Sequence, residues 1–340
     1  MPKPTILVIG DTHLHPHQQF SRIGPDGMNS RVSIVLDQLR KAGQWAREHQ
    51  VPYFVHLGDV FHTRDFVSYR VWNAAFDAFR LFCSNFRQSY FLVGNHDILG
   101  ERAGYTIDAF AATPNVFIIS RVTDVPLIPG GVRFVPWLWR DRPTNPDIPA
   151  MEEAFVHSSA KVILAHCPVK GAMLNPLAKQ VFEEGVSVGC RGNPESVLIG
   201  HCHIRQQLGD YDVWHLGSFC PVTAAEDRQA GGFGVIYDDG SCQIIDNDAP
   251  MFISVRPGDA VTDADLKGNY VRVIGQDSKM AERAGALGVV EIESEQAKPQ
   301  AIEWLRFDDI QAMADAYAVE NHGDLDVETL KALGKELLGG

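Results

Sequence analysis

Five short clusters of Asp, Asn and His residues constrain this chain more than any other feature, because each directly follows an apolar segment. They are Asp11–His13, Gly58–His62, Gly94–Asp97, Ala165–His166 and Gly200–His203. The preceding segments are rich in β-branched and aromatic residues, as strands buried on both faces are. Any one cluster alone would be an ordinary turn. Ligand sites in layered α/β sheets lie at the carboxyl ends of strands, so we expect the five clusters to meet at one edge.

Strand-like and helical patterns alternate through the first 100 residues, which predicts an α/β layered fold. The expected elements there are strands at 5–9, 53–55 and 90–93 and helices at about 32–49 and 69–86. Beyond residue 110 the chain becomes richer in strands. The expected elements there are strands at 116–119, 132–135, 161–164, 196–199, 212–214, 232–237 and 243–245 and a short helix at 151–158.

A change in composition at residues 257–267, where Pro, Gly and Asp gather, divides the chain. The expected parts are a core at 1–255, a small α/β cap domain at 256–305 and C-terminal helices within 306–340. The expected cap elements are strands at 270–274 and 289–292 and a helix at 278–286. The closing helices are expected at about 307–319 and 327–338.

The overall composition excludes several protein classes. Hydrophobic residues make up 45% and charged residues 21% of the chain, as in ordinary globular proteins. No apolar run reaches membrane-spanning length, and the apolar segment before Gly10 is too short for a signal peptide. Six scattered cysteines without a CxxC pair indicate reduced thiols of a cytoplasmic protein. The net charge of −13 argues against non-specific coating of DNA, although bound divalent cations would offset part of it.

The residue types in the five clusters indicate a metal site. Imidazole, carboxylate and amide groups without thiolate suit divalent first-row metals rather than a structural zinc site. We expect Cys202, between two candidate histidines, to pack on the opposite side. Seven ligands exceed the needs of one ion and suit a pair that shares a carboxylate, which can clamp the attacking and leaving oxygens of a displacement at phosphorus. The candidates are Asp11, His13, Asp59, Asn95, His166, His201 and His203.

These clusters resemble the D-x-H, G-D, G-N-H-[DE], H and G-H-x-H motifs of the calcineurin-like metallophosphoesterases, over about residues 1–250. The resemblance implies a four-layer α-β-β-α sandwich with two metals at the strand ends. The implied ligands of the first metal are Asp11, His13, Asp59 and His203. Those of the second are Asp59, Asn95, His166 and His201, so that Asp59 bridges. The resemblance also implies that His96 contacts phosphate and protonates the leaving oxygen, and that Asp97 orients His96.

Finer features resemble one branch of this family. The block from Gly58 to His62 resembles the G-D-[LIV]-F-[DH] block of SbcD-type double-strand-break-repair nucleases, which include bacteriophage recombination nuclease subunits. The segments Phe91–Asp97 and His215–Ser218 fit the same branch, with Leu216 in place of a proline. This resemblance implies a DNA exonuclease or endonuclease in which His62 assists in handling the substrate phosphate. It implies Mn²⁺ as the metal, with Mg²⁺, Fe²⁺ and Zn²⁺ as alternatives.

The same resemblance implies partners. These are DNA and an SMC-like zinc-hook ATPase of the SbcC type, which the C-terminal helices would bind. The alternative is that these helices simply pack on the core. The aromatic helix at 69–86 implies a homodimer, with an ordinary core helix as the alternative. No membrane partner is expected. The implied location is the cytoplasm near the nucleoid, or the host cytoplasm if the chain is encoded by a phage.

Two other functions stay open from the sequence. One is a small-molecule or nucleotide phosphodiesterase or phosphatase with the same core. The other is a binding subunit without metals, against which the intact ligand residues in every cluster argue.

Overall fold

The computed structural model describes residues 2–64, 66–99, 104–142, 144–187, 194–209, 212–275 and 279–292. The chain divides into two compact units, Met1–Glu291 and Ile292–Gly340, and the described residues lie almost entirely in the first. The expected C-terminal helices at 307–319 and 327–338 lie outside the described residues, as does Cys190.

The first of two six-stranded sheets carries three of the five clusters. In spatial order it contains β14 (Cys242–Asp246), β13 (Gly232–Tyr237), β1 (Pro4–Ile9), β2 (Tyr53–His56), β3 (Gln88–Leu92) and β4 (Val116–Ile119). The four strands from β1 to β4 are parallel, and β13 pairs with β1 in the antiparallel sense. The carboxyl ends of β1, β2 and β3 therefore meet at one edge.

The second six-stranded sheet carries the other two clusters. In spatial order it contains β11 (Gln206–Gln207), β12 (Val213–His215), β10 (Ser196–Gly200), β7 (Val162–His166), β6 (Val132–Val135) and β5 (Thr123–Val125). Its four central strands are parallel, and antiparallel strands close both edges. Adjacent β7 and β10 end at His166 and Gly200, which pair directly.

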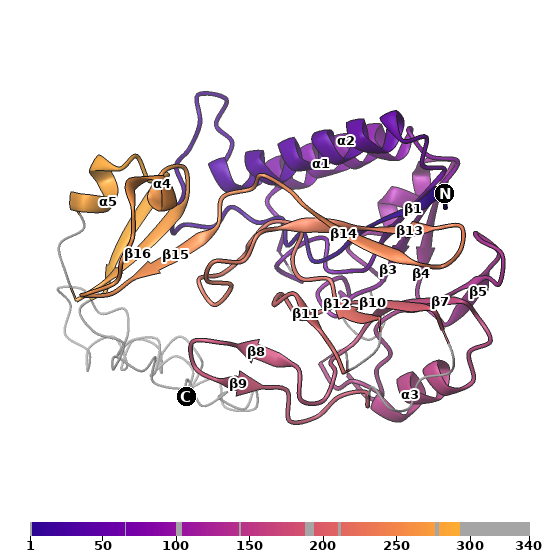
Figure 1. Ribbon diagram of the computed structural model, residues 1–340. Helices are drawn as coiled ribbons and strands as arrows, with labels where there is room; N and C mark the ends of the chain where they lie inside the picture. Colours follow the sequence, from indigo (N-terminus) through magenta and orange to yellow (C-terminus); the bar gives the residue numbers. More distant parts are fainter. Residues whose placement is uncertain are drawn as a thin grey trace, which may run out of the picture. The chain divides into compact units, whose positions relative to one another are not determined.

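The two sheets face each other across an apolar core. Side chains alternate along β1: Ile6 and Val8 are buried with Leu164 and Leu198 of the second sheet, as the period of two in a strand requires. Leu7, on the opposite face of β1, belongs to the cluster that includes the apolar sides of the flanking helices. A helix layer lies outside each sheet (Figure 1). The expected four-layer α-β-β-α sandwich is confirmed.

Three helices form the outer layers: α1 (Ser30–Glu48), α2 (Tyr69–Cys83) and α3 (Ile148–Val156). The Asn29 side chain caps α1 by accepting a hydrogen bond from the backbone N–H of Arg31. Apolar residues three and four apart bury one face of α1. They are Val32, Val35, Leu39, Ala42 and Ala46.

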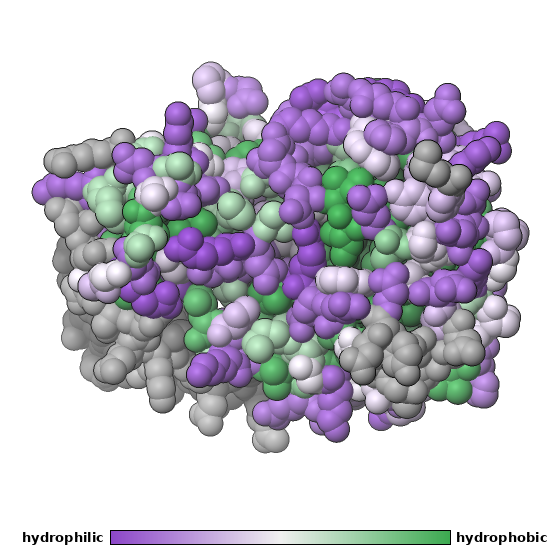
Figure 2. Space-filling model, viewed as in Figure 1, coloured by the Kyte–Doolittle hydropathy of each residue, from purple (hydrophilic) through white to green (hydrophobic). Residues whose placement is uncertain are grey.

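Two phenylalanines of the expected helix at 69–86 face the core. The ring centroids of Phe82 and Phe86 lie 4.8 and 5.5 Å from that of Phe54 on β2. Both phenylalanines are buried within the chain, so this part of the aromatic pattern is that of a core helix. Hydrophilic side chains cover the described surface over the layer of α1 and α2 in the view of Figure 2. The homodimer stays a prediction.

A three-stranded sheet follows the sandwich, in the order β15 (Phe252–Val255), β16 (Tyr270–Ile274) and β17 (Gly288–Ile292). Two short helices, α4 (Asp263–Leu266) and α5 (Lys279–Arg283), accompany it. The cap sheet thus begins at Phe252, four residues before the expected boundary at 255/256. Pairing with β16 draws this segment into the cap sheet, and the change in composition comes only after it.

Several short elements have no counterpart in the sequence prediction. They are β5, β11, β15, α4, the 3₁₀ helix η1 (Asp108–Ala112) and the hairpin of β8 (Met173–Asn175) and β9 (Gln180–Val181). Strands of two or three residues are too short to show a period of two. Within the described ranges, no helix has the length and apolar character needed to cross a membrane.

Candidate active site

The candidate metal ligands lie at the carboxyl ends of β1, β2, β3, β7 and β10 or on the loops that follow them. Four of these residues have a positive φ, which L-residues rarely adopt: Asp11 (51°), His13 (39°), Asp59 (58°) and His201 (88°). Strained backbone of this kind persists only where the surrounding structure enforces it, and it gathers at functional sites. The residues with strained backbone therefore lie at the same strand ends as the five clusters.

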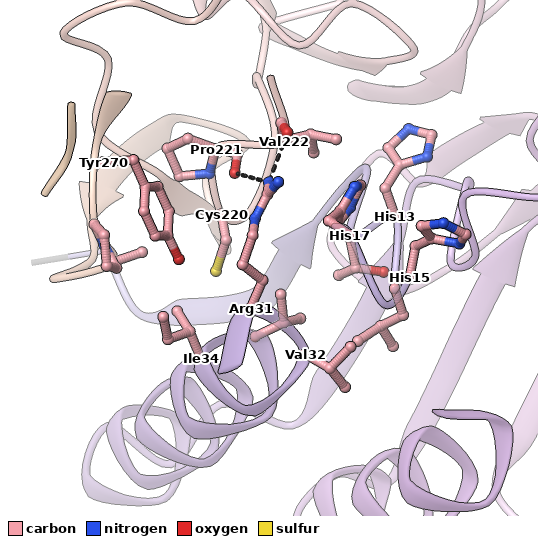
Figure 3. Close-up of a pocket in the computed structure, with 15 residues that line it drawn as sticks. His13, His15, His17, Arg31, Val32, Ile34, Cys220, Pro221, Val222 and Tyr270 are labelled. Carbon is pink, nitrogen blue, oxygen red and sulfur yellow. Dashed lines mark hydrogen bonds between the residues drawn. The ribbon is translucent and has the colours of Figure 1, made fainter. Parts of the chain in front are cut away.

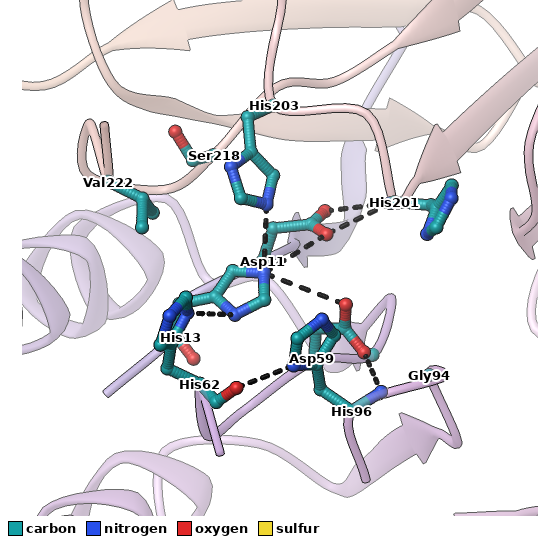
Figure 4. Close-up of polar contacts among 12 residues, drawn as sticks. Asp11, His13, Asp59, His62, Gly94, His96, His201, His203, Ser218 and Val222 are labelled. Atoms are coloured by element: carbon teal, nitrogen blue, oxygen red, sulfur yellow. Dashed lines mark hydrogen bonds and ion pairs between the residues drawn. The ribbon is translucent and has the colours of Figure 1, made fainter. Parts of the chain in front are cut away.

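One group of ligand atoms centres on His13. Its Nε2 atom lies 2.8 Å from Nε2 of His203, 4.0 Å from Asp11 and 3.6 Å from Oδ2 of Asp59 (Figure 4). The carboxylate of Asp11 is held in place by the backbone N–H of His201, at 2.9 and 3.2 Å from its two oxygens. Asp11, His13 and His203 can share one metal ion.

A second group lies on the other side of Asp59. Oδ1 of Asn95 is 3.1 Å from Nε2 of His166 and 2.8 Å from Nδ1 of His201. Oδ2 of Asp59 lies 3.5 Å from Nε2 of His166, so one carboxylate oxygen lies between both groups. The structure brings together all seven ligand residues that the sequence predicted.

The donor set fits two divalent cations. Nε2 of His13 and Nε2 of His203 face each other at 2.8 Å, and one cation can take the lone pairs of both nitrogens. Neutral histidines, carboxylates and one amide oxygen are the donors that divalent first-row metals take. Asp59, shared between the groups, has the lone pairs to bridge.

Burial gives the site strongly perturbed electrostatics. Burial raises the pKa of Asp11 to about 6. Burial alone would lower the pKa of His166, but the Asp59 carboxylate at 3.5 Å raises it to about 9. Burial also holds the pKa of His13 and of His201 well below the usual range, so both are neutral ligands near pH 7. Because the carboxylates of Asp11 and Asp59 are both buried, bound cations would stabilise their negative charge.

His96 is positioned by two hydrogen bonds beside Asp59. Its backbone N–H donates to Oδ1 of Asp59 at 2.8 Å, and its Nδ1 lies 2.5 Å from the carbonyl oxygen of His62. A carbonyl only accepts, so Nδ1 of His96 carries a proton and Nε2 is the atom left for substrate. The imidazole ring of His62 contacts that of His13, with 3.4 Å between the Nδ1 atoms of the two rings.

The structure corrects the expected role of Asp97. Its buried carboxylate accepts hydrogen bonds from the backbone N–H groups of Asp59 (2.8 Å), Val60 (3.0 Å) and Gly94 (2.9 Å). These bonds join the loops after β2 and β3, whereas the group that orients His96 is the His62 carbonyl. Asp97 therefore holds the loop that carries Asp59.

Glu226 is a functional residue that sequence reasoning missed. Its buried carboxylate lies 3.5 Å from Nδ1 of His203 and accepts hydrogen bonds from Ser218 and from the backbone N–H of Val222 and Thr223. Such a carboxylate fixes the tautomer of a ligating histidine, leaving Nε2 for the metal. Glu226 belongs to none of the five clusters, so no sequence signal marked it.

Replacing Glu226 with Gln is expected to lower the affinity of one of the two Mn²⁺ sites by about 10- to 100-fold. The amide oxygen still accepts from the backbone, but the charge beside His203 is lost. Calorimetric titration with Mn²⁺ measures the change, and exposed Glu153→Gln on α3 is the matched control. A Glu226→Gln isotherm identical to that of the wild type would show that Glu226 does not support metal binding through His203.

His56 is a second residue outside the predicted set. It is fully buried at the end of β2, and its Nδ1 accepts from the backbone N–H of Gly58 at 3.1 Å. Its Nε2 is therefore the protonated nitrogen and donates to the Thr12 hydroxyl at 3.2 Å, which in turn donates to the Val60 carbonyl at 3.0 Å. This relay joins the loops after β1 and β2, which carry three of the ligands.

The expected packing role of Cys202 also agrees with the structure. Its buried thiol lies 3.1 Å from the carbonyl oxygen of Met173. The described cysteines are free thiols.

Comparison with known proteins settles the family. The model of the calcineurin-like phosphoesterases matches residues 4–205, more than half of the chain. The chain belongs to the calcineurin-like phosphoesterase family. The matched range includes all seven ligand residues, so this member is a metal-dependent phosphoesterase with candidate ligand groups for a dimetal site.

Two solved structures are similar to this chain over about 70% of its length. One is an archaeal phosphodiesterase, with 15% identity and a TM-score of 0.38, covering 71% of this chain and 99% of that chain. The other is a dimetal phosphatase from Danio rerio, with 13% identity and a TM-score of 0.46, covering 70% of this chain and 93% of that chain. No curated protein matches the chain.

Proposed function

We propose that this phosphoesterase cleaves the phosphodiester backbone of DNA as the nuclease subunit of an SbcCD-type repair or recombination complex. The block from Gly58 to His62 supports this proposal, because it places a histidine next to the metal ligands, as in the SbcD-type nucleases it resembles. The small α/β cap after the core supports it as well.

Each residue of the site has a separate role in the proposed reaction. When bound, the two cations supply an activated water and neutralise charge at phosphorus. Asp59 fixes the spacing of the two ligand groups, and its Oδ1 holds the backbone of His96. In its imidazolium form, with a proton on each nitrogen, His96 gives the Nε2 proton to the departing sugar oxygen and keeps the Nδ1 proton, which the His62 carbonyl accepts.

The observation that carries the DNA proposal is that the site adjoins two neighbouring pockets. One, with a volume of about 280 Å³, is lined by His62 and reaches Phe252 of the cap sheet. The other, of about 260 Å³, is lined by His201 and His203 and reaches Asn175 on β8. Thr223 lines both. These two pockets would accommodate the nucleotides next to the scissile phosphate.

The alternative is a small-molecule or nucleotide phosphodiesterase or phosphatase with the same core. The net charge of −13 favours it, because DNA binding draws on a positive field. Charge supplied by the cations and by an SMC-like zinc-hook ATPase of the SbcC type would compensate in the nuclease.

A nuclease assay separates the two functions. With Mn²⁺, the purified protein is expected to degrade linear duplex DNA, and an SbcC-type ATPase is expected to increase the rate. Bis(p-nitrophenyl) phosphate serves as the control that the metal site is active. Hydrolysis of this control and of nucleotides, with linear duplex and single-stranded DNA left intact, would establish the small-molecule alternative instead.

A further inference from the structure

The pocket of about 260 Å³ beside the metal ligands His201 and His203 is lined mostly by uncharged side chains. They are Leu174, Asn175, Gln180, Ile204, Thr223 and Ala225. Glu226 also lines the pocket, and none of its described lining residues is a lysine or an arginine. Amides and aliphatic surface without a cation suit an uncharged polar group better than an anion. A neutral part of the substrate therefore fits this pocket better than a second phosphate does.

The hairpin of β8 and β9, which forms one wall of the pocket, is anchored beside the metal ligands. The side chain of Gln206 binds the backbone of Met173 twice: Oε1 accepts from its N–H at 2.7 Å, and Nε2 donates to its carbonyl at 2.8 Å. Just after β9, the backbone N–H of Phe182 donates to the carbonyl of Ala172 at 2.9 Å. The ring centroid of Phe182 lies 5.5 Å from that of His201. The base of the hairpin is thus fixed relative to a metal ligand.

The segment that carries Thr223 and Glu226 forms another wall, and it is held in place as well. Nη2 of Arg31 donates to the carbonyl oxygens of Pro221 at 3.2 Å and Val222 at 2.6 Å, as Figure 3 shows. The Glu226 carboxylate accepts from the backbone N–H groups of Val222 and Thr223 at 2.9 and 2.8 Å. Because both walls are already built, little ordering is needed when a substrate group enters.

The side-chain amide of Asn175 is oriented by the turn of its own hairpin. Its Oδ1 accepts hydrogen bonds from the backbone N–H groups of Leu177 at 3.0 Å and Ala178 at 3.2 Å. Backbone N–H groups only donate, so this atom is the amide oxygen, and Nδ2 keeps both of its donor hydrogens. Within the described ranges, neither Nδ2 of Asn175 nor the amide of Gln180 has a hydrogen-bond partner. Two unused amides therefore line the pocket.

We propose that this pocket takes the base of a nucleotide next to the scissile phosphate. Nδ2 of Asn175 donates to a carbonyl oxygen or ring nitrogen of the base, since purine ring nitrogens and the carbonyls of thymine and guanine accept hydrogen bonds. Gln180 supplies a second amide, and Leu174 and Ile204 supply apolar contact. The volume of about 260 Å³ lies below the roughly 300 Å³ at which drug-sized pockets begin, so it suits one base. The inference rests on the proposed function and refines it, because the substrate must then carry a base at this position.

Inhibition of bis(p-nitrophenyl) phosphate hydrolysis tests the pocket, because this reaction needs no cleavage of DNA. The inhibitors are thymidine 3′- and 5′-monophosphate and the two abasic 1,2-dideoxyribose phosphates that lack thymine. With Mn²⁺, one of the two nucleotides is expected to have a Ki about 10- to 100-fold below that of its abasic counterpart, as two hydrogen bonds would give.

Two variants assign this base dependence to the hairpin. Asn175→Asp keeps the oxygen that the turn needs but removes the donor, and it is expected to reduce the ratio of the two Ki values at least several-fold. Gln180→Leu leaves the turn untouched and is expected to reduce the ratio as well. Exposed Asn73→Asp on α2 is the matched control and should keep the wild-type ratio.

The outcomes separate the base pocket from the proposed function. Equal Ki values for nucleotide and abasic counterpart, with the phosphate at either position, overturn the base pocket and leave DNA cleavage standing. A wild-type ratio that neither Asn175→Asp nor Gln180→Leu changes overturns it too, because the base is then bound elsewhere. Base-dependent inhibition by a protein that leaves DNA intact supports the pocket but overturns the nuclease, and the substrate is then a nucleotide.

Discussion

Replacing Asp59 with Asn is expected to lower kcat on bis(p-nitrophenyl) phosphate by at least about 10³-fold, because metal stabilisation of the transition state amounts to several kcal/mol. Oδ2 of Asp59 lies 3.6 Å from His13 and 3.5 Å from His166, between the two ligand groups. Asn removes the charge that lets one side chain bridge two cations. It also tolerates the positive φ of 58° at this position, so the backbone can stay in place.

Metal content distinguishes this effect from unfolding. Mass spectrometry of protein dialysed against limiting Mn²⁺ is expected to find fewer than two ions bound to Asp59→Asn. Exposed Asp77→Asn on α2 is the matched control and should keep two. An Asp59→Asn protein with two bound Mn²⁺ ions and wild-type kcat would rule out the bridge.

His96→Gln is expected to lower cleavage of DNA by about 10²- to 10⁴-fold, the usual contribution of a general acid. The loss should be much smaller with bis(p-nitrophenyl) phosphate, because nitrophenolate leaves without a proton whereas a sugar oxygen needs one. Mn²⁺ binding should persist, because His96 is not one of the seven candidate ligands. The measurement is kcat on both substrates at saturating Mn²⁺.

The dependence on the leaving group is the decisive part of this second prediction. An equal loss on both substrates would show that His96 acts on the phosphate or the metals rather than on the leaving oxygen. Exposed His157→Gln provides the matched control, with wild-type rates expected on both substrates.

The ligand set could be predicted from the sequence because parallel strands fix where their ends lie. Each cluster follows an apolar segment, and the direct pairings Ile9↔His56 and Gly200↔His166 bring the ends of neighbouring strands together. Only residue types and their order along the chain are needed for that inference. The two facing sheets then bring all seven ligands to one place.

The residues around the ligands could not be predicted in the same way. Glu226 contacts His203 from 23 positions farther along the chain, and His56 acts through a hydroxyl on another loop. Contacts between single residues that are far apart along the chain leave no periodic pattern in the sequence, so the sequence does not predict them. Asp97 lay inside a recognised cluster, yet its hydrogen bonds to Asp59, Val60 and Gly94 depend on how two loops pack.

Crystals grown with Mn²⁺ and measured at the manganese absorption edge test the central claim most directly. Two anomalous peaks are expected on either side of Asp59, one contacting His13 and His203 and the other contacting Asn95, His166 and His201. A single peak, or peaks away from Asp59, would contradict the account of a shared two-cation site.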